Sequence, residues 1–226
     1  MESDIFARHF PPATPEELRA LIKTFRHRSM FLSQVKKRFA SSPADVRLIT
    51  KAYDWNADIF FNKFRESGES YLNGHLVPVA TLGMIYWDVV DPTLIVSGLC
   101  HDSIEDIDWV TRVVLELEFN ARSAFIVSGM TKPPVPTGLS KKSTEYCLLN
   151  VSNVESAGFE AVFIKCLWDR LHNMLTLWGP YEKREWKILE TELYFIPLAK
   201  KHSLPTEELE MAVAEQKQKL LQMKIT

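Results

Sequence analysis

The 226-residue sequence predicts an all-α protein. Three observations support this prediction: helix-capping signals precede several apolar segments, apolar residues recur at intervals of three and four, and short alternating runs of β-branched residues are scarce. A chain of this length can bury one substantial core without disulfides or a structural metal. We therefore expect a helical bundle of about 8–10 helices.

Capping signals mark the start of three of the predicted helices. Thr14-Pro15-Glu16-Glu17 combines an N-cap residue, a proline in the first turn and a capping-box glutamate. Ser42-Pro43 and Asp91-Pro92 begin two further helices in the same way. The other helices are predicted from the recurrence of apolar residues. The predicted helices cover residues 15–39, 43–62, 75–88, 92–105, 109–118, 121–131, 157–178, 183–200 and 206–223.

The chain divides into a main domain and two terminal segments. Residues 1–43 are predicted to form an N-terminal helical extension packed on the domain, residues 44–200 the main domain, and residues 201–226 a C-terminal helix. The stretch 132–142, KPPVPTGLSKK, has the composition of a loop.

Composition excludes several function classes. The 27 basic and 29 acidic residues leave a net charge of −2, so no global charge indicates a nucleic-acid partner. None of the eight glycines occurs in a GxGxxG or GxxxxGK motif, so Rossmann and P-loop nucleotide sites are not expected. The charge is uneven, however, because residues 85–119 contain eight acids and a single base.

The cysteines and the apolar segments indicate a cytoplasmic protein. Cys100, Cys147 and Cys166 form no CxxC motif, which argues against a disulfide framework and a zinc ribbon. The longest apolar stretch, residues 76–87, is too short to cross a bilayer, and the N-terminus lacks the features of a secretion signal. We expect no membrane role.

The predicted helix 92–105 ends in a group of ionisable residues. It is apolar over its first turns and then presents His101, Asp102, Glu105 and, just beyond it, Asp106. Burying such groups is costly unless they are paired or bind a cation. Imidazole and carboxylate together suit a transition metal, and further carboxylates can transfer protons.

Two other apolar helices each carry one embedded ionisable group. His75 begins HLVPVATLGMIYW, and Asp169 lies within IKCLWDRLHNMLTLW. The order His, His-Asp, Asp resembles the ligand pattern of the HD phosphohydrolases, in which helices converge on a metal. Four protein ligands leave coordination positions open for water and substrate.

A more specific resemblance extends over about residues 44–200. The segments ADVRLITKAYDWNADIFFNKFRESGESY, GHLVPVA, GLCHDSIED, FIVSGMTK, IKCLWDRLHNM and EKREWKILETELYFIPLAK follow one another in this order. They are similar to the landmarks of the hydrolase domain of RelA/SpoT-type enzymes and of small stand-alone alarmone hydrolases. The resemblance implies an HD-domain helical bundle.

The resemblance also implies a reaction and a set of site residues. In the family, the 3′-pyrophosphate of ppGpp or pppGpp is removed, which leaves GDP or GTP. By this resemblance, Glu105 and Asp106 activate or orient the attacking water. The residues matching the family's ligands for one divalent ion, usually Mn²⁺, are His75, His101, Asp102 and Asp169. The residues matching its substrate contacts are Arg65, Ser67, Asn173 and Thr176.

Several positions depart from the family pattern. Glu66 stands where a second basic residue commonly follows Arg65, and Leu175 replaces a common arginine. Trp168 occupies a position that is usually small, and one extra residue precedes His75. An adenine alarmone such as ppApp therefore stays open as a substrate.

Alternative functions also stay open. One is a generic HD nucleotidase or phosphodiesterase, and another is a nucleotide-sensing or toxin-binding module with weak turnover. If the chain is an alarmone hydrolase, a toxic alarmone synthetase is a candidate partner. The sequence does not predict the oligomeric state. We expect His172 to pack beside the metal ligands or to contact one of them, without binding the metal itself.

Overall fold

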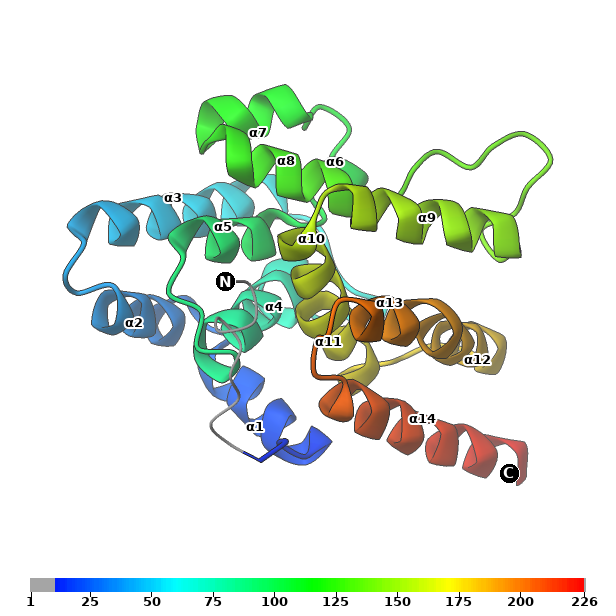
Figure 1. Ribbon diagram of the computed structural model, residues 1–226. Coiled ribbons are helices and arrows are strands. Elements are labelled where there is room, and N and C mark those ends of the chain that lie inside the picture. The colour runs from blue at the N-terminus through cyan, green and yellow to red at the C-terminus, as the bar shows by residue number, and fades with distance from the viewer. Residues whose placement is uncertain (1–10, 226) are drawn as a thin grey trace.

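The computed structural model describes residues 11–225 (Figure 1), so residues 1–10 of the predicted N-terminal extension and residue 226 lie outside the described residues. Within the described part, every regular element is helical, apart from an isolated antiparallel bridge between Phe64 and Ser70. The α-helices are α1 (Pro15–Phe25), α2 (Arg28–Arg38), α3 (Pro43–Ile59), α4 (Val77–Thr81), α5 (Pro92–Cys100), α6 (Ser103–Asp106), α7 (Arg112–Glu118), α8 (Ala121–Met130), α9 (Thr144–Ser156), α10 (Phe159–Phe163), α11 (Leu171–Leu175), α12 (Tyr181–Glu190), α13 (Ile196–Lys201) and α14 (Glu207–Ile225). The π-helical segments are η1 (Leu72–Leu76), η2 (Leu82–Tyr86), η3 (Ile164–Arg170) and η4 (Thr191–Phe195).

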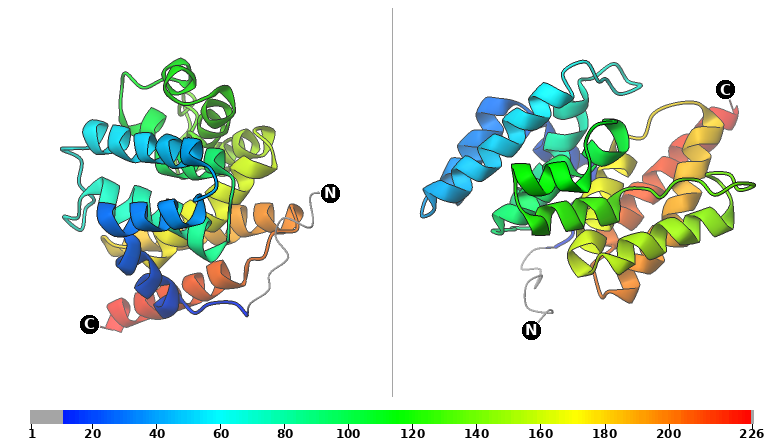
Figure 2. Two further views of the ribbon diagram at one scale, coloured as in Figure 1. Left: turned by 90° about the vertical axis from the view of Figure 1, so that its left-hand side faces the viewer. Right: turned by 90° about the horizontal axis from the view of Figure 1, so that it is seen from above.

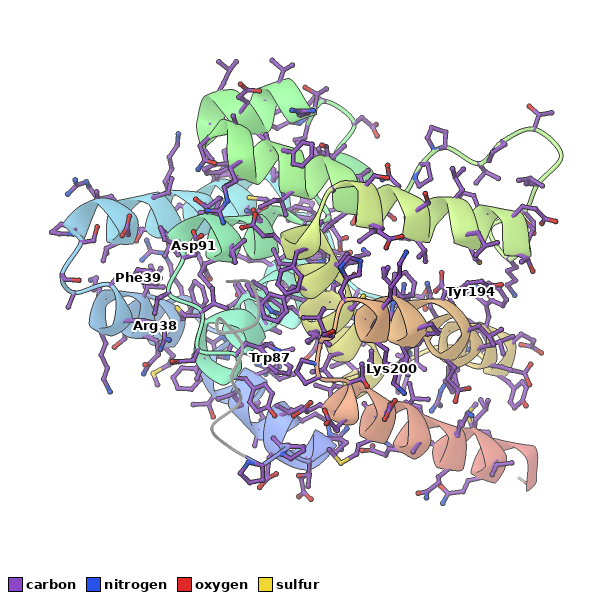
Figure 3. The ribbon with its side chains drawn as sticks, in the orientation of Figure 1. Arg38, Phe39, Trp87, Asp91, Tyr194 and Lys200 are labelled. Atoms are coloured by element: carbon purple, nitrogen blue, oxygen red, sulfur yellow. The ribbon has the colours of Figure 1, made fainter. Side chains whose placement is uncertain are left out.

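The all-α prediction is confirmed, and the capping signals act as expected. Thr14 accepts a hydrogen bond from Glu17 N, and the Glu17 carboxylate accepts one in return from Thr14 N, which completes the capping box. Ser42 caps α3, and Asp91, labelled in Figure 3, caps α5 through a 2.8 Å bond from Thr93 N.

The predicted helices differ from the structure at several places, among them one divided helix and one helix that was not predicted. The predicted helix 15–39 is divided at His27, whose extended backbone (φ −95°, ψ 147°) separates α1 from α2. Helix α9 was not predicted, because its apolar residues do not form one face: Leu148 and Leu149 are exposed, whereas Cys147 is buried. Ser143 caps this helix, and most of the predicted loop 132–142 before it is irregular.

The helices pack around two apolar clusters. The larger cluster, here the main core, draws on α2 to α5, α8, α10 and η3, and includes Phe31, Leu99 and Phe163. The smaller, here the terminal cluster, joins α1 and α14 to α11, with Leu18 and Leu171 among its members. In Figures 1 and 2, α1 and α14 lie together at one end of the molecule, and α7 and α8 lie at the other. The division into residues 1–43, 44–200 and 201–226 stays a prediction.

Trp168 lies at the centre of the main core with no exposed surface. A Cβ atom at Gly83 would lie 2.3 Å from its ring, and one at Gly98 would lie 2.9 Å from it. Two glycines on neighbouring helices therefore make room for this large side chain. Trp87, labelled in Figure 3, adds a 3.3 Å hydrogen bond from its Nε1 to Leu167 O.

None of the helices in the described part of the chain combines the length and the hydropathy that a bilayer span requires.

Candidate metal centre and active site

Four side chains from three separate parts of the sequence meet at the centre of the bundle. His75 comes from η1, His101 and Asp102 from the end of α5, and Asp169 from η3. We call these four residues the ligand cluster. The His75 Nε2 atom lies 3.1 Å from His101 Nε2 and 3.1 Å from Asp102 Oδ2. Asp169 Oδ1 lies 3.5 Å from His75 Nε2 and 3.6 Å from His101 Nε2.

Local backbone geometry brings His101 and Asp102 together. The predicted helix 92–105 is interrupted at these residues, because α5 ends at Cys100 and α6 begins at Ser103. Asp102 has φ −101° and ψ 0°, so the chain turns there. Both adjacent side chains can therefore reach one point, which residues next to each other on a regular helix do not do.

Hydrogen bonds orient both imidazoles. His101 Nδ1 lies 2.8 Å from Gly98 O, so it is the protonated nitrogen and Nε2 is left to face the cluster. His75 Nδ1 lies 2.9 Å from His172 Nδ1, which leaves its Nε2 facing the cluster as well. Partners of this kind fix the tautomer of metal-binding histidines. His172 is buried and contacts His75, as expected for a residue that packs beside the cluster.

The donor set of the ligand cluster fits a divalent transition metal. His75, His101 and Asp102 offer ligand atoms that all lie within 4.8 Å of one another, and all three residues are buried. Donor atoms about 2.1 Å from one ion and at right angles to each other lie about 3 Å apart, close to the separations seen here. Two imidazoles with carboxylates are suited to ions such as manganese, iron or zinc.

The carboxylates of the ligand cluster are held in their charged form. Burial acts to raise the pKa of Asp169, but the charge of the Lys165 ammonium, together with the nearby His101, lowers it well below its usual value. Burial likewise opposes the charge of Asp102, and His101 outweighs it and lowers the pKa of this group too. Ionised carboxylates are the form that binds a cation.

Sequence reasoning missed two residues that touch the ligand cluster. Lys165 is 2% exposed, and its Nζ lies 2.7 Å from Asp169 Oδ2. The Tyr71 hydroxyl donates a 2.7 Å hydrogen bond to Asp102 Oδ2. A signal was available for both, because each lies four residues before a ligand in the sequence and therefore on the same side of a helix.

The two acids predicted to handle water occupy different surroundings. Glu105 lines the cavity that leads to the ligand cluster and forms an ion pair with Lys132. Asp106 is half-buried beside Tyr71, and burial together with the nearby Asp102 charge raises its pKa. Of the two, Glu105 is the one that faces the space a substrate would occupy.

That cavity has a volume of about 310 Å³, and more basic than acidic side chains line it. Arg65, Ser67 and Asn173 line it, and Asn173 Nδ2 donates a 2.5 Å hydrogen bond to Asp169 Oδ1. Thr176 lies elsewhere, in a separate cavity of about 150 Å³ that is also lined by His172. Its hydroxyl donates to His172 O. The basic residues of the larger cavity are Arg65, Lys132, Lys165, Arg170, Lys183 and Lys187.

Glu190 forms buried ion pairs with two basic residues of the cavity wall. Arg170 Nη1 lies 2.8 Å from Glu190 Oε2, and Lys187 Nζ lies 3.0 Å from the same oxygen. Burial acts to raise the pKa of Glu190, but the Arg170 charge and Lys187 together lower it to about 2. Because Arg170 directly follows Asp169 of the ligand cluster, the ion pair between Arg170 and Glu190 anchors η3.

The sequence was compared with protein-family models and with known proteins. No protein-family model matches the chain. The chain is 31% identical over 159 residues to a GTP pyrophosphokinase of Myxococcus xanthus, covering 69% of this chain and 20% of that protein. It is 30% identical over 169 residues to the guanosine-3′,5′-bis(diphosphate) 3′-pyrophosphohydrolase of Aquifex aeolicus, covering 73% and 23%. The chain thus spans about a fifth of the length of these relatives.

A solved structure shares the fold. It is described as a metazoan ortholog of SpoT that hydrolyzes ppGpp, and it matches with a TM-score of 0.51 over 70% of this chain and 97% of that one. The sequence identity of 19% supports a common fold and no more. The sequence relatives confirm the relationship that the motifs indicate: the chain is a relative of the RelA/SpoT-type proteins.

Proposed function

We propose that the chain is a metal-dependent hydrolase that removes the 3′-pyrophosphate from alarmones such as ppGpp, pppGpp or ppApp. The products would be pyrophosphate and the nucleoside 5′-diphosphate or 5′-triphosphate. The observation that carries this proposal is the ligand cluster itself: four ionisable groups from three helical segments converge at the inner end of a basic cavity. Relatives named for this chemistry support it.

The ligand cluster is the proposed metal site, and manganese is the proposed ion. A divalent cation held there would supply Lewis-acid chemistry, lowering the pKa of water and offsetting the charge of the phosphoryl oxygens. Asn173 and Lys165 each bond to one oxygen of Asp169, so this carboxylate is fixed before an ion binds. Preorganised ligands of this kind need little rearrangement on binding.

Glu105 is the proposed general base. Its carboxylate lines the cavity next to the ligand cluster and would accept a proton from the attacking water. The water oxygen would form a bond to the phosphorus attached to O3′, the bond between that phosphorus and O3′ would break, and O3′ would take up a proton to become the ribose 3′-hydroxyl. Lys132 holds the carboxylate against the cavity wall. Asp106 would act through Tyr71 and Asp102 by helping to orient them.

Cations of the cavity are the proposed phosphate contacts. Arg65, Lys132, Lys183 and Lys187 all line it, and a substrate with several phosphates needs such compensation. Arg65 also donates a 3.2 Å hydrogen bond to Gly74 O, which fixes its guanidinium at the wall beside His75. Ser67 and Asn173 belong to the same proposed substrate set, as does Thr176 from its separate cavity.

The decisive experiment identifies the products. The full chain is incubated with Mn²⁺ and either ppGpp or ppApp, and the released phosphate species are separated. Pyrophosphate and a nucleoside 5′-diphosphate are expected. Orthophosphate, or cleavage on the 5′ side, would favour a generic HD nucleotidase or phosphodiesterase, and tight binding without turnover would favour a sensing module.

Two further expectations belong to this proposal. The cytoplasm is the proposed location, supported by three cysteines that are all free and buried. A toxic alarmone synthetase is the proposed partner, and co-expression with such an enzyme should relieve its growth inhibition if alarmone is degraded.

A further inference from the structure

Two large aromatic side chains stand exposed at the entrance of the catalytic cavity. Phe64 is 63% exposed and Trp178 is 64% exposed, and both line the cavity that leads to the ligand cluster. Exposed aromatic residues grouped at one cavity are unusual for a surface without a binding role. The ligand cluster at the inner end of the same cavity is buried, so the aromatic pair marks its outer end.

The two aromatic residues come from segments that meet. Phe64 precedes Glu66 in the connection after α3, and Trp178 precedes Gly179 in the connection between α11 and α12. A Cβ atom at Gly179 would lie 3.3 Å from Glu66 Oε2, so the two connections are in contact. Lys183 of α12 also pairs with Glu66 across this boundary. Phe64 and Trp178 therefore belong to one continuous rim.

Hydrogen bonds and packing hold both connections in place. Phe64 forms an antiparallel bridge with Ser70, and Arg65 N donates a 2.8 Å bond to Glu69 O within the same tight turn. On the other side, Leu177 packs against the terminal cluster and fixes the backbone next to Trp178. The rings are thus exposed on supported backbones, as a preformed platform requires.

We propose that Phe64 and Trp178 bind the base of the nucleotide substrate by stacking. This inference rests on the proposed function, because it gives the base a place once the 3′-pyrophosphate lies at the ligand cluster. Every nucleobase presents a flat π face, and stacking on aromatic side chains does not depend on the hydrogen-bonding edge. The platform therefore accepts guanine and adenine alike.

The test separates base binding from hydrolysis. Affinity for GDP and for ADP is measured by calorimetry on the full chain, and KM and kcat are measured with ppGpp. Phe64→Ala and Trp178→Ala are expected to weaken nucleotide affinity and raise KM by roughly 5- to 100-fold each, with kcat nearly unchanged. The losses should be similar for GDP and ADP.

Matched variants control for the change of surface. Phe61→Ala alters a 77% exposed ring three residues before Phe64 that does not line the cavity, so its affinity should equal that of the wild type. Trp178→Phe keeps a stacking ring and should retain most of the affinity that Trp178→Ala loses. Circular dichroism and melting curves verify that each variant is folded.

The outcomes distinguish the inference from the proposed function. If Phe64→Ala and Trp178→Ala change affinity and KM no more than Phe61→Ala does, the platform is refuted even in an active enzyme. If the chain binds GDP through the two rings but does not hydrolyse ppGpp, the platform stands and the proposed function fails. A loss for one base only would also overturn the stacking model, because it would indicate recognition of the base edge.

Discussion

The inner and outer ends of the cavity that leads to the ligand cluster both contain charged side chains, but these side chains are held in place differently. At the inner end, Lys165 and Asp169 are 2% and 4% exposed, and each carboxylate oxygen of Asp169 has its own partner. At the outer end, Lys183 and Glu66 are 42% and 59% exposed and form a simple surface pair. Buried charges are fixed by several partners, whereas exposed pairs are weak and can exchange with a ligand. Under the proposed function, the inner end would fix an ion and the outer end would release its cations to phosphate.

The largest effect is expected from removing charge at the inner end. Asp169→Asn should eliminate stoichiometric divalent-metal binding and lower turnover by roughly 10³-fold or more, since a metal supplies several kcal/mol of transition-state stabilisation. Metal content by plasma mass spectrometry and pyrophosphate release check this. Asp58→Asn, at an exposed aspartate of α3, is the matched control and should behave as wild type. A variant that keeps both metal and turnover would show that Asp169 is no ligand.

A smaller loss, confined to chemistry, is expected at Glu105. Glu105→Gln keeps the size of the side chain but cannot accept a proton, so kcat should fall by about 10²–10⁴ while metal content stays unchanged. Steady-state kinetics on metal-loaded protein measure this. Full turnover of the metal-loaded variant would refute the assigned role of Glu105.

Removing the buried ion pair between Arg170 and Glu190 should lower the stability of the fold and not the rate of the chemical step. Glu190→Gln leaves Arg170 without its charged partner and should lower the free energy of unfolding at pH 7 by about 3 kcal/mol. The folded pKa of Glu190, about 2, lies below its ordinary 4.5, so its stabilising contribution is present above pH 4.5 and is lost as the pH falls towards 2. Urea unfolding should therefore show a smaller gap between wild type and variant at pH 3.5 than at pH 7. If the difference in free energy of unfolding between wild type and variant is the same at pH 3.5 and pH 7, Glu190 is not the charged partner of Arg170.

The smallest effect is expected at the outer end. Lys183→Met removes the surface pair with Glu66 and should change the free energy of unfolding by less than about 1 kcal/mol. In metal-free protein, Lys165→Met should lower the free energy of unfolding by about 3 kcal/mol, because it leaves the Asp169 carboxylate buried without its cation. Thermal melts of the two variants, side by side, measure the contrast. Equal losses would mean that the two ends of the cavity do not differ as described.

Much of the fold could be predicted because local signals determine it. Capping residues such as Thr14, Ser42 and Asp91 fix helix starts through short-range hydrogen bonds, and the sequence displays them directly. Helix α9 escaped prediction because its apolar residues are divided between a buried and an exposed side. Its position depends on contacts with α8 and α10, which no local pattern records.

The sequence allowed the four residues of the ligand cluster to be singled out, but it did not allow their surroundings to be predicted. His75, His101, Asp102 and Asp169 stand out because each is an ionisable group in an apolar segment. Asn173 lies one helical turn after Asp169 and bonds to it, but α11 ends at Leu175, so Thr176 lies past the regular helix and in another cavity. The exposed rim escaped notice for a different reason: the sequence does not state which aromatic residues are left uncovered.

The π-helical segment η1 has a consequence for length variation. A regular helix that gains one residue rotates every later side chain by about 100°. In η1, the amide of Val77 reaches back five residues to Leu72 O, so this wider turn holds one more residue than an α-helical turn and the helix continues into α4. The extra residue before His75, relative to the family pattern, falls where such a turn can accommodate it. Insertions and deletions among related chains therefore need not be confined to loops, and an alignment that forbids gaps inside helices would misplace this histidine.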